Sequence, residues 1–355
     1  MLKNFGGSIA FTLVCLVLAA AYGWFQTASV SATLAMLWIV VMLSVLEISL
    51  SFDNAVVNAV VLGEMDAIWQ RRFLTWGMVI AVFGMRIVFP VAIVAIASGI
   101  GPIEATRISL TEPSRYEEIV SGAHVGIAGF GGAFLAMVGL SFFFDGEKDV
   151  HWIAWIEARL ARFADIKAAE IAILLVAVYG ISLLLPPDEG LTFLGASALG
   201  IVTFIAVEAI GTLLEIREEA QKAAGIVVRS GLAGFLYLNV LDASFSFDGV
   251  IGAFALSNNM VVIALGLSIG AMFVRSLTLL LVKQGTLAEY RYLEHGAFWA
   301  ILALAAIMLI SAHVEISETV TGLIGAVLIG LSLWWSVRHK RRFPDCEIED
   351  ALRAE

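Results

Sequence analysis

Long apolar stretches alternate with short polar segments along the whole chain. Each stretch approaches the roughly 20 mostly apolar residues that a helix needs to cross about 30 Å of hydrocarbon. The stretches are residues 8–25, 31–63, 74–98, 123–144, 170–186, 191–214, 226–256, 260–282, 297–312 and 319–337. The pattern predicts an all-α polytopic membrane protein of about ten transmembrane helices, with residues 1–355 forming a single transmembrane domain.

The first apolar stretch has two interpretations. Lys3 precedes it and its end reads AAAYG, which are features of a cleaved signal peptide. The apolar character continues through Trp24 and Phe25, which makes the stretch long enough to span. We therefore expect a retained first helix.

Charges in the connecting segments test this topology independently. Ten crossings place the loops alternately on two sides of the membrane. Only Arg107 and Arg115 fall on one side, Arg86 and Arg275 fall inside spans, and all the other lysines and arginines among the 21 fall on the opposite side. The positive-inside rule assigns that side to the cytoplasm. We expect both termini in the cytoplasm and the chain in a bacterial plasma membrane.

Composition supports the membrane prediction and excludes one class of partner. The chain is 60% hydrophobic and only 15% charged, whereas a soluble domain has about 25% charged residues. The net charge of −10, without a basic stripe, does not suit nucleic-acid binding. The two cysteines form no framework. Membrane lipid is the expected surrounding, and a homo-oligomer is left open.

Two cytoplasmic segments are expected outside the spans. Residues 145–169 form an amphipathic connector, in which Trp152, Ile156 and Leu160 recur at helical spacing with Glu157 on the opposite, polar face. Such a helix either lies in the headgroup layer or simply connects two spans. Residues 338–355 form a cytoplasmic tail.

The chain contains one short segment twice. Residues 240–249, VLDASFSFDG, are identical to residues 45–54, VLEISLSFDN, at six of ten positions, and Asp242 keeps the carboxylate of Glu47. The spans that follow also match, because Gly77 and Arg86 recur 189 residues later as glycine and arginine. In the next spans GAFLAMVGL at 132–140 corresponds to GAFWAILAL at 296–304.

Three consecutive helices are therefore duplicated, at about residues 31–144 and 226–312. The two units begin at the second and seventh spans, which are five crossings apart, so the second unit runs through the membrane in the opposite direction. This predicts an inverted repeat, a plan common in secondary transporters, with the binding site near the midplane between the repeats.

Four acids within the repeated motifs need an explanation, because a charged carboxylate at the bilayer centre costs about 2.5–3.5 kcal/mol. The polar residues of the first copy share one helical stripe: Ser44, Glu47, Ser51, Asn54 and Asn58. Asp53 lies about 120° from that stripe on a continuous helix. Breaks near Ser49–Ser51 and Ser244–Ser246 would turn both acids of each copy into one cavity, since serine hydroxyls can satisfy freed backbone groups.

Four neighbouring carboxylates stay ionised only beside a cation. The predicted metal ligands are Glu47, Asp53, Asn54, Asp242 and Asp248, supported by Ser51, Asn58, Asn239, Ser246, Arg86 and Arg275. Such oxygen ligands suit Mg²⁺, Ca²⁺ or Mn²⁺, whereas Zn²⁺ and copper prefer imidazole or thiolate. Arg86 and Arg275 either neutralise the acids in the metal-free state or form fixed ion pairs that orient helices. No resident cofactor is expected.

These motifs resemble the TerC family of integral membrane proteins, within the LysE transporter superfamily. The resemblance lies in EISLSFDNAVVNA, from Glu47, and DASFSFDGVIGAFAL, from Asp242. Asp53 and Asn54 complete the match to the first family motif, and Asp248 completes the match to the second.

The resemblance implies a LysE/TerC-like fold and metal-ion export, with Mn²⁺ as the leading cargo and Ca²⁺ next. It covers the two repeated units, and the additional helices indicate a divergent, long branch. Gly249 replaces a polar residue common in the family, which removes one amide ligand from the second motif.

The sequence thus predicts a transporter, not an enzyme, which exports a hard divalent cation by alternating access. Exchange against H⁺ would follow from carboxylates that bind metal and protons in turn. One alternative is a membrane partner or assembly protein that supplies metal to other proteins. A weaker alternative is an intramembrane aspartyl protease, but Asp53 and Asp248 are each preceded by Ser-Phe rather than by the Gly-x-Gly such enzymes carry.

Overall fold

The computed structural model describes residues 2–77, 79–88, 91–92, 94–95, 99–146, 150–160, 169–223, 231–254, 256–257, 259–284, 290–314, 316 and 318–342. Within this part of the chain all regular structure is helical and no strand occurs. The elements are α1 (Leu2–Thr27), α2 (Val30–Leu50), α3 (Phe52–Glu64), α4 (Ala67–Arg72), the π-helical segments η1 (Phe73–Gly77) and η2 (Ile80–Val88), α6 (Pro102–Thr111), α7 (Pro113–Gly122), α8 (His124–Phe143), α9 (Ala154–Leu160), α10 (Ala169–Ser182), α11 (Pro187–Ala223), α12 (Leu232–Phe254), α13 (Met260–Gln284), α15 (Leu293–Ser311) and α16 (Glu318–Arg342).

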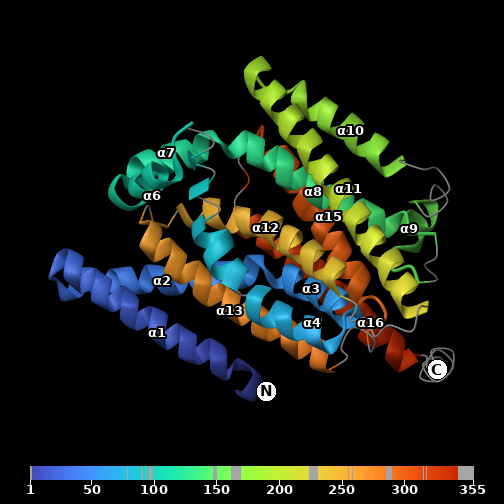
Figure 1. The fold of residues 1–355 in the computed structure, drawn as a ribbon, viewed down its shortest axis with the longest axis horizontal. Helices are drawn as coiled ribbons and strands as arrows, with labels where there is room; N and C mark the ends of the chain where they lie inside the picture. The colour runs from blue at the N-terminus through green and yellow to red at the C-terminus, as the bar shows by residue number, and fades with distance from the viewer. Residues whose placement is uncertain are drawn as a thin grey trace.

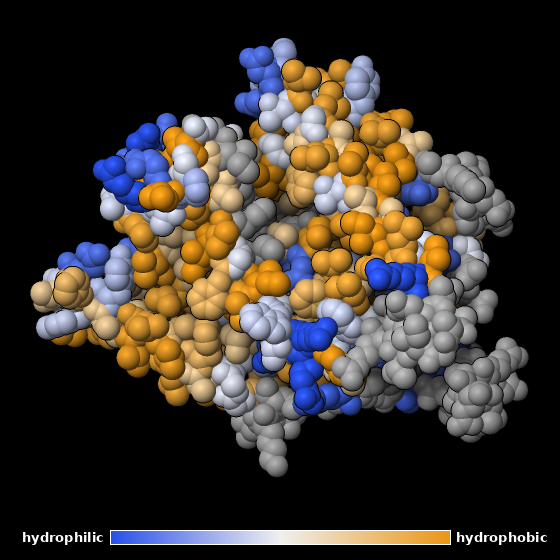
Figure 2. Space-filling model, in the orientation of Figure 1, coloured by the Kyte–Doolittle hydropathy of each residue, from blue (hydrophilic) through white to orange (hydrophobic). Residues whose placement is uncertain are grey.

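Six of the described helices contain a stretch long and apolar enough to cross a membrane, namely α1, α2, α8, α11, α13 and α15. Shorter apolar helical stretches at Ala169–Ser182 and Leu232–Ala243 occupy parts of two further predicted spans, and one at Asn54–Gly63 occupies the end of the span that α2 begins. Large apolar side chains cover the outer surface, as the orange areas of Figure 2 show. A helical membrane protein is therefore confirmed, and the count of ten spans stays a prediction.

The helices form a tilted bundle with different elements at its two ends (Figure 1). The helices α6 and α7 lie at the upper left of the view, whereas α9 lies at the right, and α4 and the end of α16 lie toward the lower right. The pair α10 and α11 flanks α8 on one edge, and α1 flanks α2 and α13 on another. Polar segments are thus gathered at both ends of an apolar bundle.

Packing between the two predicted repeats is reciprocal. The first helix of one unit contacts the second helix of the other unit, since α2 lies against α13 and α12 lies against η2. The third helices, α8 and α15, contact each other directly. Small residues allow this approach: a Cβ on Gly132 would lie 3.1 Å from the backbone nitrogen of Leu309, and one on Gly139 would lie 2.5 Å from Leu302. Helices in lipid associate through such small residues because apolar burial supplies little driving force there.

One of the two predicted helix breaks is confirmed. The helix α2 ends at Leu50, Ser51 has φ −101° and ψ 18°, and α3 begins at Phe52. The backbone N–H of Ser51 still donates to the carbonyl of Glu47 at 2.9 Å, so the chain bends rather than reverses. The helices α2 and α3 accordingly lie roughly end to end (Figure 1).

The break predicted at Ser244–Ser246 is wrong, because α12 runs unbroken from Leu232 to Phe254. Serine tolerates a break but does not require one, since its hydroxyl also bonds within an intact helix. The second predicted unit differs from the first in another respect. Its second helix, α13, is a regular α-helix, whereas the equivalent helix of the first unit contains η1 and η2. Such π-helical turns often occur at functional sites.

The connector docks onto the bundle through Glu157, which corrects the prediction that this residue lies on a polar, outward face. Glu157 is buried. Its carboxylate accepts hydrogen bonds from the backbone N–H groups of Trp152 and Ile153 at 2.8 and 3.0 Å, and from the indole N–H of Trp299 on α15 at 2.8 Å. A carboxylate is favourable there because the start of α9 presents unsatisfied N–H groups. The tail is described only as far as Arg342.

Candidate polar cavity between the repeats

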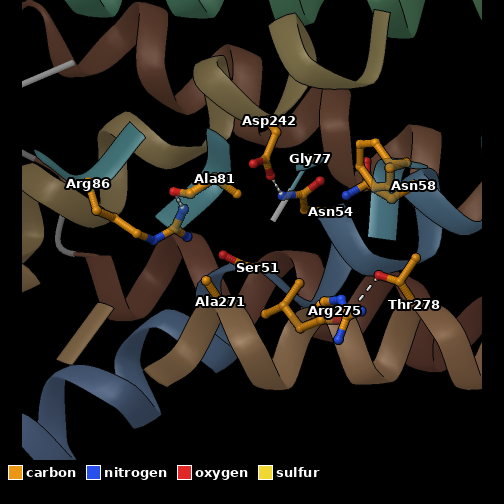
Figure 3. A pocket seen from close by; sticks show the side chains of 12 residues that line it. Ser51, Asn54, Asn58, Gly77, Ala81, Arg86, Asp242, Ala271, Arg275 and Thr278 are labelled. Atoms are coloured by element: carbon orange, nitrogen blue, oxygen red, sulfur yellow. Dashed lines mark hydrogen bonds between the residues drawn. The ribbon is translucent and has the colours of Figure 1, made fainter. Parts of the chain in front are cut away.

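A buried polar cavity lies where α3, η1, η2, α12 and α13 meet (Figure 3). Its volume is about 30 Å³. One water molecule needs about 10–15 Å³ of such space, so the cavity has room for a small ion or a few waters and not for an organic substrate. It is lined by Ser51, Asn54, Asn58, Phe73, Gly77, Ala81, Arg86, Asp242, Ala271, Val274, Arg275 and Thr278.

Glu47 and Arg86 form a buried ion pair at the edge of the cavity. Ser51, at the bend, also donates its hydroxyl to Glu47 Oε1 at 3.2 Å. The guanidinium of Arg86 makes a second hydrogen bond, to the backbone carbonyl of Ala81 at 2.6 Å. A buried carboxylate without a counter-charge is strongly unfavourable, and Arg86 supplies that counter-charge beside Glu47.

The two repeated motifs meet at Asn54 and Asp242. Asn54 Nδ2 donates a hydrogen bond to Asp242 Oδ1 at 2.7 Å, although the residues are 188 positions apart. Figure 3 shows the two side chains approaching each other across the cavity, one from α3 and one from α12. This contact joins the first copy of the motif to the second.

Asn58 supplies an acceptor that the described part of the protein does not use. Its side chain is 5% exposed and lines the cavity. Its Oδ1 atom has no hydrogen-bond partner among the described residues. Buried polar atoms nearly always have a partner, so an orphaned acceptor facing a cavity points to a water or an ion as its partner.

The helix α13 supplies another wall of the cavity. Arg275 and Thr278 contribute a guanidinium and a hydroxyl, and Ala271 and Val274 fill the space beside them. Val274 and Arg275 lie three and four residues after Ala271, and Thr278 lies four and three residues after them, which places all four on one face of a helix. That spacing around Arg275 is the signal that would have identified Thr278, a lining residue that sequence reasoning missed.

Two of the five predicted ligands line the cavity, and a third touches a lining residue. Asn54 and Asp242 are in the wall, and Glu47 is bonded to Ser51. The side chains of Asp53, Asp248 and the supporting Ser246 lie outside the described residues, although their backbones belong to α3 and α12. Within the described part of the chain, no group of three or more histidine, cysteine, aspartate or glutamate side chains is placed to hold a metal ion.

The supporting residues divide in the same way. Ser51, Asn58, Arg86 and Arg275 all line the cavity. Asn239 does not, and its amide donates instead to the carbonyl of Phe235 in its own helix at 2.6 Å. The ion pair of Arg86 with a buried acid agrees with the structure, whereas neutralisation of the acids in a metal-free state stays a prediction.

The apolar helices and the buried polar cavity among them define the class of protein. It is an integral membrane protein with an internal polar site. The chain belongs to the DUF475 family, described as protein of unknown function, whose model matches residues 52–343. The match includes the second motif and both arginines of the cavity, and it begins just after Glu47 and Ser51. No curated protein and no solved structure matches the chain.

Proposed function

We propose that this protein exports a hard divalent cation across the plasma membrane, with Mn²⁺ as the leading cargo and Ca²⁺ next. The observation that carries the proposal is the hydrogen bond between Asn54 and Asp242 beside a cavity of about 30 Å³. Carboxylate, amide and hydroxyl oxygens converge there from two copies of one motif. Oxygen atoms are the ligands that Mg²⁺, Ca²⁺ and Mn²⁺ prefer.

The proposal includes ten spans arranged as an inverted repeat, in the manner of the TerC family. Reciprocal packing of α2 on α13 and of α12 on η2 supports it, because a two-fold relation exchanges these two pairs. One end of the bundle carries α4 and α9, and the other end carries α6 and α7. This arrangement agrees with cytoplasmic termini and an even number of crossings.

In this proposal the residues of the cavity act in a simple sequence. The cation enters the space lined by Asp242, Asn54 and the unused acceptor of Asn58. Its charge competes with Arg86 for Glu47, and Asp53 and Asp248 complete the ligand set. Protonation of the same carboxylates in the opposite phase of the cycle would release the cation, which gives exchange against H⁺.

Transport of Mn²⁺ into proteoliposomes tests the proposal. Wild type is compared with Asp242→Asn, Asp53→Asn and Asp248→Asn, which keep the side-chain shape and remove the charge. Asp66→Asn is the matched control, because Asp66 is exposed just before α4, away from the cavity. Thermal melting in detergent verifies that each variant is folded.

Loss of Mn²⁺ flux in the three variants of the proposed ligands, with normal flux in Asp66→Asn, is the expected result. Equal flux in all variants would refute the ligand assignment. No flux in wild type with Mn²⁺, Ca²⁺ or Mg²⁺ would reject transport of hard divalent cations. In that case the partner-protein alternative, in which the membrane protein supplies metal to other proteins, becomes the better explanation.

A further inference from the structure

The contact between α2 and α13 is extremely close. A Cβ atom on Gly266 would lie 2.5 Å from Leu43 Cβ, and a Cβ atom on Gly270 would lie 2.4 Å from Glu47 Cβ. The hydroxyl of Ser44 donates to the carbonyl of Gly266 at 3.1 Å, across the same contact. We call this contact the outer seam, defined by Leu43, Ser44 and Glu47 facing Gly266 and Gly270.

The repeat gives the outer seam an equivalent. Adding 195 to Leu43, Ser44 and Glu47 leads to Leu238, Asn239 and Asp242, and subtracting 189 from Gly266 and Gly270 leads to Gly77 and Ala81. These residues lie on α12 and on the η1–η2 segment, which also face each other. We call this equivalent contact the inner seam.

The inner seam is open where the outer seam is closed. The three atoms nearest to a Cβ position on Gly77 all belong to the ring of Phe73, in its own segment, rather than to α12. The cavity is lined by Gly77, Ala81 and Asp242 together (Figure 3). In the outer seam α2 fills the equivalent space against α13, whereas in the inner seam the cavity lies between α12 and the η1–η2 segment. Asn239, the equivalent of Ser44, bonds to its own helix instead of across the seam.

The two seams lie in opposite halves of the membrane, given the orientation proposed above. Gly77 follows closely on Arg71 and Arg72, so the inner seam is in the cytoplasmic half. Gly266 lies near the start of α13, far from Lys283 at the other end, so the outer seam is in the external half. The outer half is also sealed by a buried apolar cluster in which Leu43 and Leu267 lie together with Tyr116 of α7.

We infer that the two seams exchange, and that the present structure is the cytoplasm-facing state of the transporter. In the exchanged state Gly77 and Ala81 pack against Leu238 and Asp242, and Asn239 bonds to the carbonyl of Gly77. The outer seam then opens at Gly266 and Gly270. The role of this exchange in transport rests on the proposed function, whereas the two contacts themselves do not depend on it. Alternating access by rocking of one repeat against the other requires two such equivalent, mutually exclusive contacts.

Glycine at both Gly77 and Gly266 fits this exchange. A Cβ atom on Gly266 would meet Leu43, which lies across the outer seam, whereas a Cβ atom on Gly77 would meet the ring of Phe73 in its own segment, at 2.9 Å. A glycine at position 77 has no such requirement from α12 in the present conformation. It is required once the inner seam closes as tightly as the outer one.

Paired cysteines test the exchange without reference to any cargo. In a background of Cys15→Ala and Cys346→Ala, one variant carries Leu43→Cys with Gly266→Cys, a second carries Leu238→Cys with Gly77→Cys, and a third carries both pairs. The full-length protein in liposomes is treated with a short bifunctional thiol reagent, and the cross-linked pairs are counted by mass spectrometry. Cross-linking at either pair is expected, but the two links should never occur in one molecule.

Ala81→Leu, introduced into each of the two single-pair backgrounds, provides a second measurement. Ala81 faces the cavity, so the leucine side chain extends into the cavity in the present state and blocks closure of the inner seam. We expect an unchanged melting temperature, at least a tenfold loss of cross-linking between positions 77 and 238, and retained cross-linking between positions 43 and 266.

The outcomes separate this inference from the proposed cargo. Exclusive cross-links together with no flux of Mn²⁺, Ca²⁺ or Mg²⁺ would retain the exchange and reject the cargo. Mn²⁺ flux in wild type with no cross-link at the inner seam would overturn the exchange and retain transport. Both links in one molecule, or equal inner-seam cross-linking in Ala81→Leu, would also overturn the exchange.

Discussion

Replacing Gly270 with alanine tests the close contact between α2 and α13. The added Cβ would lie 2.4 Å from both Cβ and Cγ of Glu47, and 3.0 Å from the carbonyl oxygen of Ser44. Contacts this short do not occur, so α13 must move away from α2, or Glu47 must move away from Arg86. Gly195 on α11 is the matched control, because nothing lies within 4 Å of its Cβ position.

The magnitude follows from two opposing effects. Alanine in place of glycine inside a helix is favourable by about 0.8–1.0 kcal/mol. Forcing an extra carbon into a packed contact costs about 1–3 kcal/mol. The net expectation for Gly270→Ala is a loss of about 0–2 kcal/mol in the free energy of unfolding. The upper part of that range is expected, since both neighbours are fixed by backbone or by an ion pair. Gly195→Ala should be neutral or gain up to about 1 kcal/mol.

Chemical unfolding in detergent micelles, followed by circular dichroism, measures both variants against wild type. The difference between them is the informative quantity, because the gain in helix propensity is common to both. If Gly270→Ala were as stable as Gly195→Ala, α2 and α13 could not approach as closely as described. The closed outer seam, and the exchange inferred from it, would then lose their basis.

Three further predictions concern separate parts of the structure. Glu157→Ala leaves three donors without their acceptor, each worth about 1–3 kcal/mol when buried, so proteolysis of the connector should accelerate strongly, whereas Arg159→Ala should not change it. Arg86→Met should lower the free energy of unfolding by about 3–5 kcal/mol, and adding Glu47→Gln should restore much of that loss. If the losses of the two single variants simply added in the double variant, the two residues would not form a direct pair. Burial raises the pKa of Tyr116, so ultraviolet titration should show this phenol ionising at higher pH than the exposed tyrosines. The free energy of unfolding should fall as pH rises above about 10, because only the unfolded state then releases the proton readily. Absence of the late ionisation in Tyr116→Phe would assign the signal to this residue.

Much of the candidate site could be predicted from the repeated motif. Duplication of Glu47 and Arg86 pointed to buried charges that belong together, and helical spacing placed Ser51, Asn54 and Asn58 on one face. The structure brings all of these to one region. A spacing rule works here because a continuous polar stripe on an apolar helix has to be buried away from lipid.

Other features could not be read from local pattern. Glu157 looked like a solvent-facing charge because its neighbours in the chain are apolar at helical spacing. It is buried because Trp299, far away in the sequence, and two backbone N–H groups supply donors that only the folded chain assembles. A carboxylate accepting three hydrogen bonds can be buried where an unpartnered one cannot.

The sequence by itself determined that the chain is a helical membrane protein, because apolar stretches of sufficient length have no other stable location. It also determined which residues are duplicated and which polar groups must find partners. Only the tertiary structure decided how two similar segments differ. The first residue of SFDN, Ser51, is the bend between two helices, whereas SFDG lies within one unbroken helix. One glycine-lined seam is closed, and its equivalent lines a cavity. Similar sequences permit both arrangements, and the choice between them depends on packing against residues that are distant in the chain, which no local pattern records.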